Sequence, residues 1–239
     1  MLRGRLLQFF VAVRRTGGGP RGFRVIGMHA LRVENPLDDP ADWRWITLLD
    51  ARAPQPAVGW ASSVVVQGSM LHRYGFIHRR DVGLARLPLE AALEGRFGDE
   101  QVWTGEGSGW IAERRLLEGP APPAAVFCRG ATEFSVRWSS DLNCWVQVQA
   151  TGRRGRSLGV RFAPRLEGAW SDLQTLHQPP EGAGASTFLY AYKAHVEQQG
   201  AAMLITYASN SLHDSVFWDE SIYWPRFIAI DVRGAVPRP

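Results

Sequence analysis

The segments DVGLARLP (81–88) and SLGVRFAP (157–164) share one plan, an apolar stretch with a central arginine and a final proline. FRVIGMHALRV (23–33) and YWPRFIAID (223–231) fit the same place in two further units. In chain order, each of the first three of these four segments is followed by a tryptophan. These residues, Trp43, Trp103 and Trp170, recur at an interval of about sixty residues. A unit of this size with four strands is typical of a large β-propeller blade, whose sheet buries both faces against its neighbours.

Short apolar or alternating runs separated by Gly, Pro, Asp and Asn predict eleven strands, whereas helical periodicity is confined to LPLEAAL (87–93). The predicted strands cover residues 6–13, 23–33, 62–66, 70–77, 82–87, 132–138, 144–150, 158–163, 188–196, 202–208 and 226–231.

The phase of the repeat places SSVVV (62–66), TEFSVRW (132–138) and YAYKAHV (190–196) as the innermost strands of their blades. The chain then opens on a second strand, GRLLQFFVAV (4–13). We therefore predict an all-β propeller that forms a single domain over residues 1–239. Its blades are four-stranded and N-terminally incomplete, with an incomplete first unit followed by three fuller ones, about four blades in all.

The charge pattern argues against nucleic acid as a partner. The net charge is +4, but the basic residues are almost all arginine and are spread along the chain, with Lys193 the only lysine. The densest group, Arg153, Arg154 and Arg156, lies in a Gly-containing turn, whereas nucleic-acid binding favours a clustered basic stripe. The apolar run at residues 6–13 resembles a short signal peptide but fits a strand better, and no run is long enough to span a membrane. The compartment stays open.

Glu133 is the candidate catalytic residue of the sequence. In TEFSVRW, Phe134, Val136 and Trp138 alternate with Glu133, Ser135 and Arg137, so one face is apolar and the other polar. A partly desolvated carboxylate at the start of an inner strand is suited to general acid catalysis of glycosidic-bond cleavage. A structural pair between Glu133 and Arg137 explains the spacing equally well.

A second polar set lies in YAYKAHVE (190–197). Alternation places Lys193, His195 and Glu197 on one face of the strand, where they could bind sugar hydroxyls or simply face solvent. The histidines have no metal-type spacing, and neither a phosphate-binding loop nor a serine nucleophile motif is present, so we expect no metal and no cofactor. The sequence leaves a calcium ion on the propeller axis open.

TYASNS (206–211) and YWPRF (223–227) resemble a bacterial domain-of-unknown-function family of five-bladed propellers related to glycoside hydrolases, some of them endo-D-arabinanases. The likeness covers about residues 4–232. It implies that Glu133 is the acid and that Lys193, His195, Asn210 and Arg226 are substrate-binding or lie between blades. Arg226 and Asn210 also fit architectural roles, as a clamp and in a turn.

The family pattern also implies a partner carboxylate, an Asp in a blade ahead of the one that opens this chain. Glycoside hydrolysis requires two carboxyl groups that flank the bond. Asp38, Asp39 and Asp42 are candidates for a substitute, although NPLDDPADW (35–43) first indicates a loop.

Two functions follow from these patterns. The first is a glycoside-hydrolase-like propeller that hydrolyses furanose-containing, arabinan-type polysaccharide, with doubtful activity because the partner Asp is not found. The alternative is a non-catalytic propeller that binds a carbohydrate or a protein. Relatives are often exported, but no export signal is visible.

Overall fold

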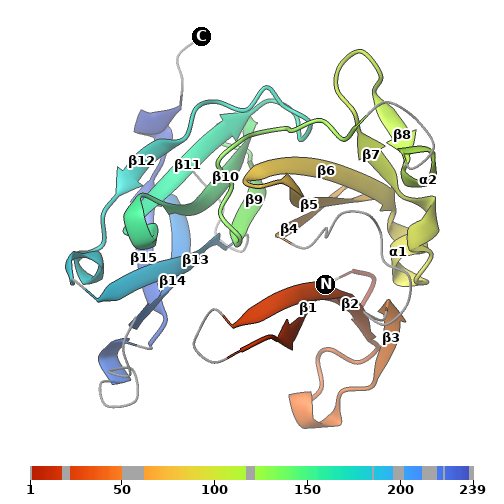
Figure 1. The fold of residues 1–239 in the computed structure, drawn as a ribbon, viewed down its shortest axis with the longest axis horizontal. Helices are drawn as coiled ribbons and strands as arrows, with labels where there is room; N and C mark the ends of the chain where they lie inside the picture. The colour runs from red at the N-terminus through yellow and green to blue at the C-terminus, as the bar shows by residue number, and fades with distance from the viewer. Residues whose placement is uncertain are drawn as a thin grey trace. The chain divides into compact units, whose positions relative to one another are not determined.

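The computed structural model describes residues 2–17, 22–49, 62–116, 122–184, 186–195, 202–211, 220–222 and 224–236, and it is all-β (Figure 1). Four antiparallel sheets follow one another along the chain, each with its strands in chain order. This arrangement confirms the predicted all-β propeller fold with about four blade sheets.

The first two sheets lie in the N-terminal part. The first contains β1 (Leu6–Arg15), β2 (Phe23–Val33) and β3 (Trp45–Leu49). The second contains β4 (Ser63–Gln67), β5 (Met70–His78), β6 (Asp81–Pro88), β7 (Gln101–Trp103) and β8 (Trp110–Ala112).

The other two sheets follow. The third contains β9 (Phe134–Ser139), β10 (Cys144–Thr151), β11 (Ser157–Ala163) and β12 (Gln174–His177). The fourth contains β13 (Thr187–Ala194), β14 (Ala202–Ser211) and β15 (Arg226–Asp231).

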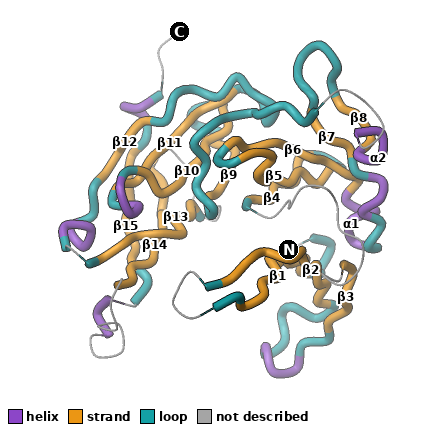
Figure 2. The backbone as a smooth tube through the Cα atoms, in the orientation of Figure 1, coloured by secondary structure: helices purple, strands orange, loops and turns teal. Residues whose placement is uncertain are grey.

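Helices are few and short (Figure 2). They are α1 (Leu89–Leu93), which confirms the helical turn predicted there, α2 (Glu113–Leu116), and the 3-10 turns Pro40–Asp42, Phe97–Asp99, Arg153–Gly155, Pro180–Ala183, Glu220–Ile222 and Arg233–Ala235. The helices within the described ranges are all too short or too polar to span a lipid bilayer.

All eleven predicted strands are present, and β3, β7, β8 and β12 are additional. The prediction of four strands in every blade was wrong in detail, because only the third sheet has four in the described chain. The second sheet has five because β8 adds to its outer edge. The predicted phase holds: β4, β9 and β13 are edge strands at the start of their sheets, and β1 pairs with the strand that follows it.

Contacts divide the chain into two compact units. Unit 1 comprises Met1–Ile77 and Gly83–Ala125, and unit 2 comprises His78–Val82 and Val126–Pro239. The prediction of a single domain stays a prediction, and each unit is described by itself.

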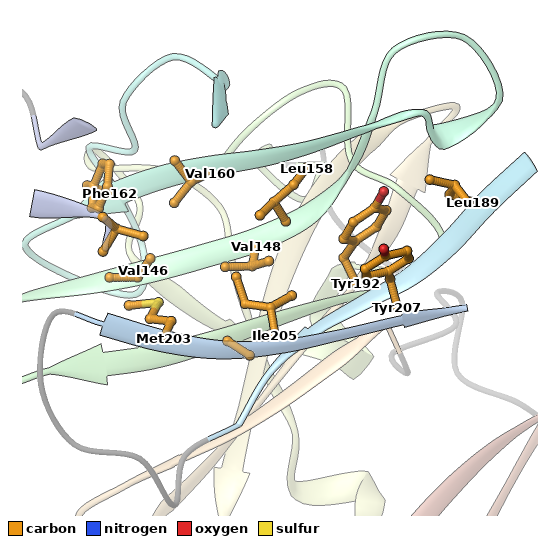
Figure 3. Close-up of a cluster of buried hydrophobic side chains, with 12 residues drawn as sticks. Val146, Val148, Leu158, Val160, Phe162, Leu189, Tyr192, Met203, Ile205 and Tyr207 are labelled. Atoms are coloured by element: carbon orange, nitrogen blue, oxygen red, sulfur yellow. The ribbon is translucent and has the colours of Figure 1, made fainter. Parts of the chain in front are cut away.

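The core of unit 2 lies between the third and fourth sheets (Figure 3). Side chains from β10 and β11 meet side chains from β13 and β14; the buried set is Val146, Val148, Leu158, Val160, Phe162, Leu189, Tyr192, Ala194, Met203, Ile205, Tyr207 and Val232. At one end of this core the rings of Tyr192 and Tyr207 stack with centroids 5.0 Å apart.

Gly155 allows the third and fourth sheets to approach closely. Its φ is +67°, and a Cβ at this position would lie 1.9 Å from the carbonyl oxygen of Leu189 on β13. The Gly155 carbonyl in turn accepts a hydrogen bond of 3.2 Å from the Tyr192 hydroxyl. Glycine is therefore required here for both backbone conformation and space.

Unit 1 contains a fully buried ion pair between Arg73 on β5 and Glu100. Both side chains have no exposed surface, and the Arg73 guanidinium donates to both carboxylate oxygens at 2.6 Å. The guanidinium also lies over the rings of Phe9 and Phe97, 5.1 and 5.2 Å from their centroids. A buried charge without its partner is strongly unfavourable, so the two residues are expected to be needed together.

We expect Glu100→Gln to lower the free energy of unfolding of unit 1 by about 3 kcal/mol, because it removes the carboxylate that pairs with the buried Arg73 guanidinium. Glu94→Gln is the matched control, since Glu94 pairs with Arg96 and both side chains are about half exposed. Its expected loss is below about 1 kcal/mol. Urea unfolding followed by tryptophan fluorescence measures both, and equal losses would contradict the assigned role of the buried pair.

Candidate functional site

Glu133 lies immediately before β9, as predicted, and is partly buried. Within β9, Phe134 and Val136 are buried on one face, while Ser135 and Arg137 lie on the other. The polar face is not a solvent-facing surface, because Arg137 is only 6% exposed.

The polar side chains of β9 bond to the backbone of β13. The Ser135 hydroxyl accepts from the Ala194 amide at 2.8 Å, and the Arg137 guanidinium donates to the His195 carbonyl at 2.8 Å. In the opposite direction, Lys193 Nζ donates to the Phe134 carbonyl at 2.8 Å. The two inner strands of unit 2 are thus joined by side-chain-to-backbone bonds.

Lys193 is the cation that interacts with Glu133. Burial lowers the pKa of the Lys193 ammonium group, and the Glu133 carboxylate opposes this shift. The sequence had suggested Arg137 as the neighbour of Glu133. The Arg137 guanidinium instead donates to the backbone carbonyl of His195, one residue after the end of β13. The Lys193 amine, bonded to the Phe134 carbonyl, therefore lies at the start of β9 and within electrostatic reach of the Glu133 carboxylate.

A β-bulge in β13 decides which side chains share a face with Lys193. The register between β13 and β14 shifts between Tyr190 and Lys193, and Ala191 has φ +54°. Strict alternation would place Tyr190 with Tyr192, but the bulge places Tyr190 opposite Ala208 and Lys193 opposite Thr206, on the same face. Tyr192 points into the core, as predicted for the opposite face.

We call this side of the fourth sheet, away from the core, the outer face; it carries Phe188, Tyr190, Lys193, His195, Thr206, Asn210 and Phe227. His195 Nε2 lies 2.9 Å from Thr206 Oγ1. The rings of Phe188 and Tyr190 lie 5.6 Å apart, and Phe227 is 64% exposed. The outer face therefore combines aromatic rings with hydrogen-bonding groups.

Asn210 lies on the outer face but away from Lys193, opposite Phe188 near the end of β14. Its side-chain oxygen accepts from the Ser211 amide at 2.7 Å. Asn210 thus lies within β14 and not in the turn that the sequence offered as its alternative role.

Arg226 lies on the opposite side of the fourth sheet. It pairs in register with Tyr207, a core residue, and its Nε lies 3.6 Å from a carboxylate oxygen of Glu181. Glu181 also accepts from the Tyr207 hydroxyl at 2.9 Å. Burial raises the pKa of Tyr207, and the Glu181 bond raises it further, so this hydroxyl stays protonated. The structure thus has Lys193 and His195 on the outer face and Glu133 at the start of β9, and it places Arg226 on the opposite side of the fourth sheet.

The acidic loop NPLDDPADW is held by its own hydrogen bonds. Asn35 donates to Asp38 at 2.7 Å, Asp39 accepts from the Ala41 amide at 2.9 Å, and Trp43 Nε1 donates to the Asp38 carbonyl at 3.0 Å. These contacts agree with the loop interpretation of the sequence.

Two further observations concern groups that could react or hold a metal. Cys128 and Cys144 are free thiols. In the part of the chain that the structure describes, no group of three or more His, Cys, Asp or Glu could hold a metal ion. Glu197, predicted beside His195, lies outside the described residues.

Sequence reasoning did not single out Ser135, Thr206 or the aromatic residues of the outer face as site residues. Thr206 lies in TYASNS, the motif that carried the family resemblance. That motif could therefore have pointed to Thr206 as a candidate site residue. Tyr190 could not be assigned to its face, because the bulge at Ala191 leaves no mark in an alternating pattern.

No family model and no curated protein matches the sequence. Solved structures do match. A candidate hydrolase of Bacteroides ovatus aligns with 96% of this chain and 58% of its own chain, with a TM-score of 0.70 and 12% identity. A mutant α-L-arabinanase of Cellvibrio cellulosa covers 96% of this chain and 70% of its own, with a TM-score of 0.48 and 10% identity. An exo-1,5-α-L-arabinanase from a bovine ruminal metagenomic library covers 95% and 70%, with a TM-score of 0.46 and 10% identity.

The likeness to the Bacteroides ovatus protein is one of fold, since so few residues are identical. This chain spans less than two thirds of that protein's length.

The single lysine allows a direct test of the pair formed by Lys193 and Glu133. In protein labelled with ¹⁵N-lysine, the one Nζ signal should titrate below the ordinary lysine pKa of about 10.4. Glu133→Gln should lower this pKa further, because the opposing carboxylate is lost. Glu220→Gln, an exposed carboxylate in the same unit, should leave it unchanged. A pKa that stays constant or rises in Glu133→Gln would show that the two groups do not interact.

Proposed function

We propose that this chain is a glycoside-hydrolase-type propeller that acts on furanose-containing, arabinan-type polysaccharide, with Glu133 as the general acid. The observation that supports the proposal is the partly buried position of Glu133 just before inner strand β9, next to Phe134, whose carbonyl accepts from the Lys193 amine. The similarity in fold between this chain and the candidate hydrolase of Bacteroides ovatus supports the proposal.

The proposed chemistry assigns Glu133 to the leaving group. A carboxylic acid at this position donates its proton to the glycosidic oxygen as the bond to the sugar breaks. The half-buried position of Glu133 keeps part of its surface from water, which strengthens its interaction with a bound substrate. The positive charge of Lys193 lies within electrostatic reach of the Glu133 carboxylate.

The outer face offers the contacts that a sugar chain needs. Aromatic rings at Phe188, Tyr190 and Phe227 provide flat apolar surfaces, and His195 with Thr206 provides hydrogen-bonding groups. We assign substrate binding to Lys193, His195 and these rings. Asn210, near the end of β14, stays a candidate for substrate binding. We assign Arg226 a structural role, as a clamp that pairs with Glu181.

Hydrolysis also requires a second carboxyl group, as base or nucleophile on the other side of the sugar. The resemblance to five-bladed propellers implies an Asp in a blade ahead of β1. We propose this residue as the partner of Glu133.

We expect Glu133→Gln to reduce the release of reducing ends from arabinan by at least about a hundredfold, because glutamine cannot donate the proton. Its thermal midpoint should stay close to that of the wild type, since Glu133 is only partly buried. Glu220→Gln serves as the matched control and should retain full activity. Unchanged activity in Glu133→Gln would remove Glu133 from the mechanism.

The second candidate function is carbohydrate binding without turnover. The aromatic and polar side chains of the outer face favour it, because they recognise sugars without any need for a second carboxylate. Wild-type protein that binds furanose oligosaccharides on a glycan array but releases no reducing ends would support this function over hydrolysis.

Both functions predict that Tyr190→Ala weakens oligosaccharide binding by about three- to tenfold, through the loss of a stacking ring on the outer face. Trp138→Ala removes an exposed ring on β9 instead and should leave the affinity unchanged. Isothermal titration with arabinan oligosaccharides measures both variants. Equal effects of the two substitutions would exclude the outer face as the binding surface.

A further inference from the structure

Arginine occupies several left-handed backbone positions. In the described chain, six residues other than glycine have a positive φ, between 44° and 60°, and four of them are arginines. They are Arg3, Arg79, Arg129 and Arg154. Glycine and asparagine adopt this conformation more readily than a long side chain does. An arginine at such a turn position therefore points to a role for its side chain.

Three of these arginines belong to unit 2, at one end of its third sheet. β9 begins opposite Gln149, near the end of β10, and β11 begins opposite Thr151. The turn between β10 and β11, which contains Arg153 and Arg154, therefore lies at the end of the sheet where Glu133 precedes β9.

Two further segments of unit 2 bring arginines to the same end. The Gln149 side-chain amide donates to the Arg129 carbonyl at 2.9 Å. The Gly130 amide donates to the Arg80 carbonyl at 2.8 Å, which places the turn at Arg79 and Arg80 beside it. We call the arginines of these turns the arginine rim; they are Arg79, Arg80, Arg129, Arg153 and Arg154.

The side chains of the arginine rim are available to an anion. Arg79, Arg80, Arg129 and Arg153 are exposed, and none of these four forms an ion pair with a residue that the structure describes. Their shared position makes the potential at this end of unit 2 positive, which attracts anionic ligands.

A buried arginine adds to this positive charge. The Arg161 guanidinium has only uncharged hydrogen-bond acceptors in the described chain, the side chains of Gln147 and Gln149 and the Cys128 carbonyl. Burial lowers the pKa of Arg161 to about 10, and the positive charge of Arg129 lowers it further. Arg161 and Arg129 are therefore close enough to repel each other.

Carboxylates at this end offset the charge only in part. Asp172 acts on Arg161, and Asp81 accepts from the Cys128 thiol. Glu181 is occupied by Tyr207 and Arg226. Together with Glu133, these carboxylates are fewer than the arginines of the rim with Arg161, so this end of unit 2 has an excess of positive charge.

We propose that the arginine rim binds oxyanion groups, carboxylates or phosphates, of a polysaccharide whose neutral furanose residue reaches Glu133. This inference rests on the proposed function, because it takes Glu133 as the residue at the cleaved bond. Guanidinium groups bind both kinds of oxyanion through paired hydrogen bonds. The substrate is then an arabinan-type chain that carries anionic groups, and neutral arabinan is a weaker ligand.

Glu133 disfavours nucleic acid as the occupant of the rim. A nucleic acid carries a negative charge on every nucleotide, so a phosphate would have to approach the Glu133 carboxylate. A polysaccharide with charges separated by neutral sugars avoids this repulsion, because a neutral sugar lies at Glu133 while the oxyanions lie at the rim.

The test compares three probes by isothermal titration with the full chain at low salt. Fragments of polyribosylribitol phosphate alternate a ribofuranose with a phosphodiester, hyaluronan oligosaccharides alternate a uronate with a neutral sugar, and arabinan oligosaccharides are neutral. We expect one or both anionic probes to bind at least about tenfold more tightly than arabinan, with a smaller advantage at high salt. The tighter of the two identifies the oxyanion as phosphate or carboxylate.

Glycine variants separate binding from folding. Arg129→Gly with Arg154→Gly should weaken binding of the tighter anionic probe at least about tenfold and leave the affinity for arabinan unchanged. The thermal midpoint should stay the same or rise, because glycine adopts a positive φ without strain. Arg3→Gly is the matched control, since Arg3 is a left-handed arginine of unit 1, and it should alter neither affinity.

Two results would overturn the proposal: equal affinities for the neutral and anionic saccharides, and an unchanged affinity of Arg129→Gly with Arg154→Gly for the anionic probe. Binding of oligothymidylate as tight as that of the anionic saccharides would assign the rim to nucleic acid instead.

The proposed hydrolysis fails in a different way. Loss of hydrolysis in Glu133→Gln, with no effect of the glycine variants on affinity, would keep the function and reject the rim. Loss of affinity in the glycine variants, with full hydrolysis in Glu133→Gln, would keep the rim and reject Glu133 as the acid.

Discussion

The apolar contact between the third and fourth sheets is the interaction on which unit 2 depends. β10 and β11 supply valine, leucine and phenylalanine to one side of it, and β13 and β14 supply methionine, isoleucine and tyrosine to the other. Because this contact fixes β13 against β9, it also fixes the distance between Lys193 and the start of β9. The candidate site is thus held by side chains that cannot take part in its chemistry.

The polar residues between β9 and β13 divide into two groups with different tasks. Ser135 and Arg137 satisfy backbone groups on the edge of β13, which would otherwise be left without partners in a half-buried position. Glu133, at the start of β9, is only partly buried. An edge strand covered in this way is protected from pairing with another chain.

The third blade shows that buried polar groups also lie away from the site. On the side of the third sheet opposite the core, Gln147 donates to Gln149 at 2.9 Å, and the Arg161 guanidinium lies 4.7 Å from the centre of the Phe127 ring. Burial lowers the pKa of Arg161 to about 10. Both faces of this sheet are therefore buried, as a propeller blade requires.

Much of the fold could be predicted from the sequence, because alternation and turn residues are local signals. The repeat of DVGLARLP and SLGVRFAP placed β6 and β11 as third strands, and both hold that position. Strands of three or four residues, such as β7 and β12, carry too few positions for a pattern and were not predicted.

The site could be predicted only in part. Glu133 and Lys193 were found because both belong to clear alternating strands, but their proximity depends on packing between two sheets, which no local pattern encodes. Arg226 was grouped with them through the family resemblance, yet its register opposite Tyr207 places it on the other side of the sheet. Tertiary geometry, rather than residue type, decided these cases.

The bulge at Ala191 makes β13 sensitive to its residue count. One extra residue keeps Leu189 and Tyr192 in the core while Tyr190 and Lys193 share the outer face. Deletion of that residue would restore strict alternation and turn either the lysine or the tyrosine ring to the wrong side. Loops in such a protein can gain and lose residues during evolution, but this strand can change only by substitution.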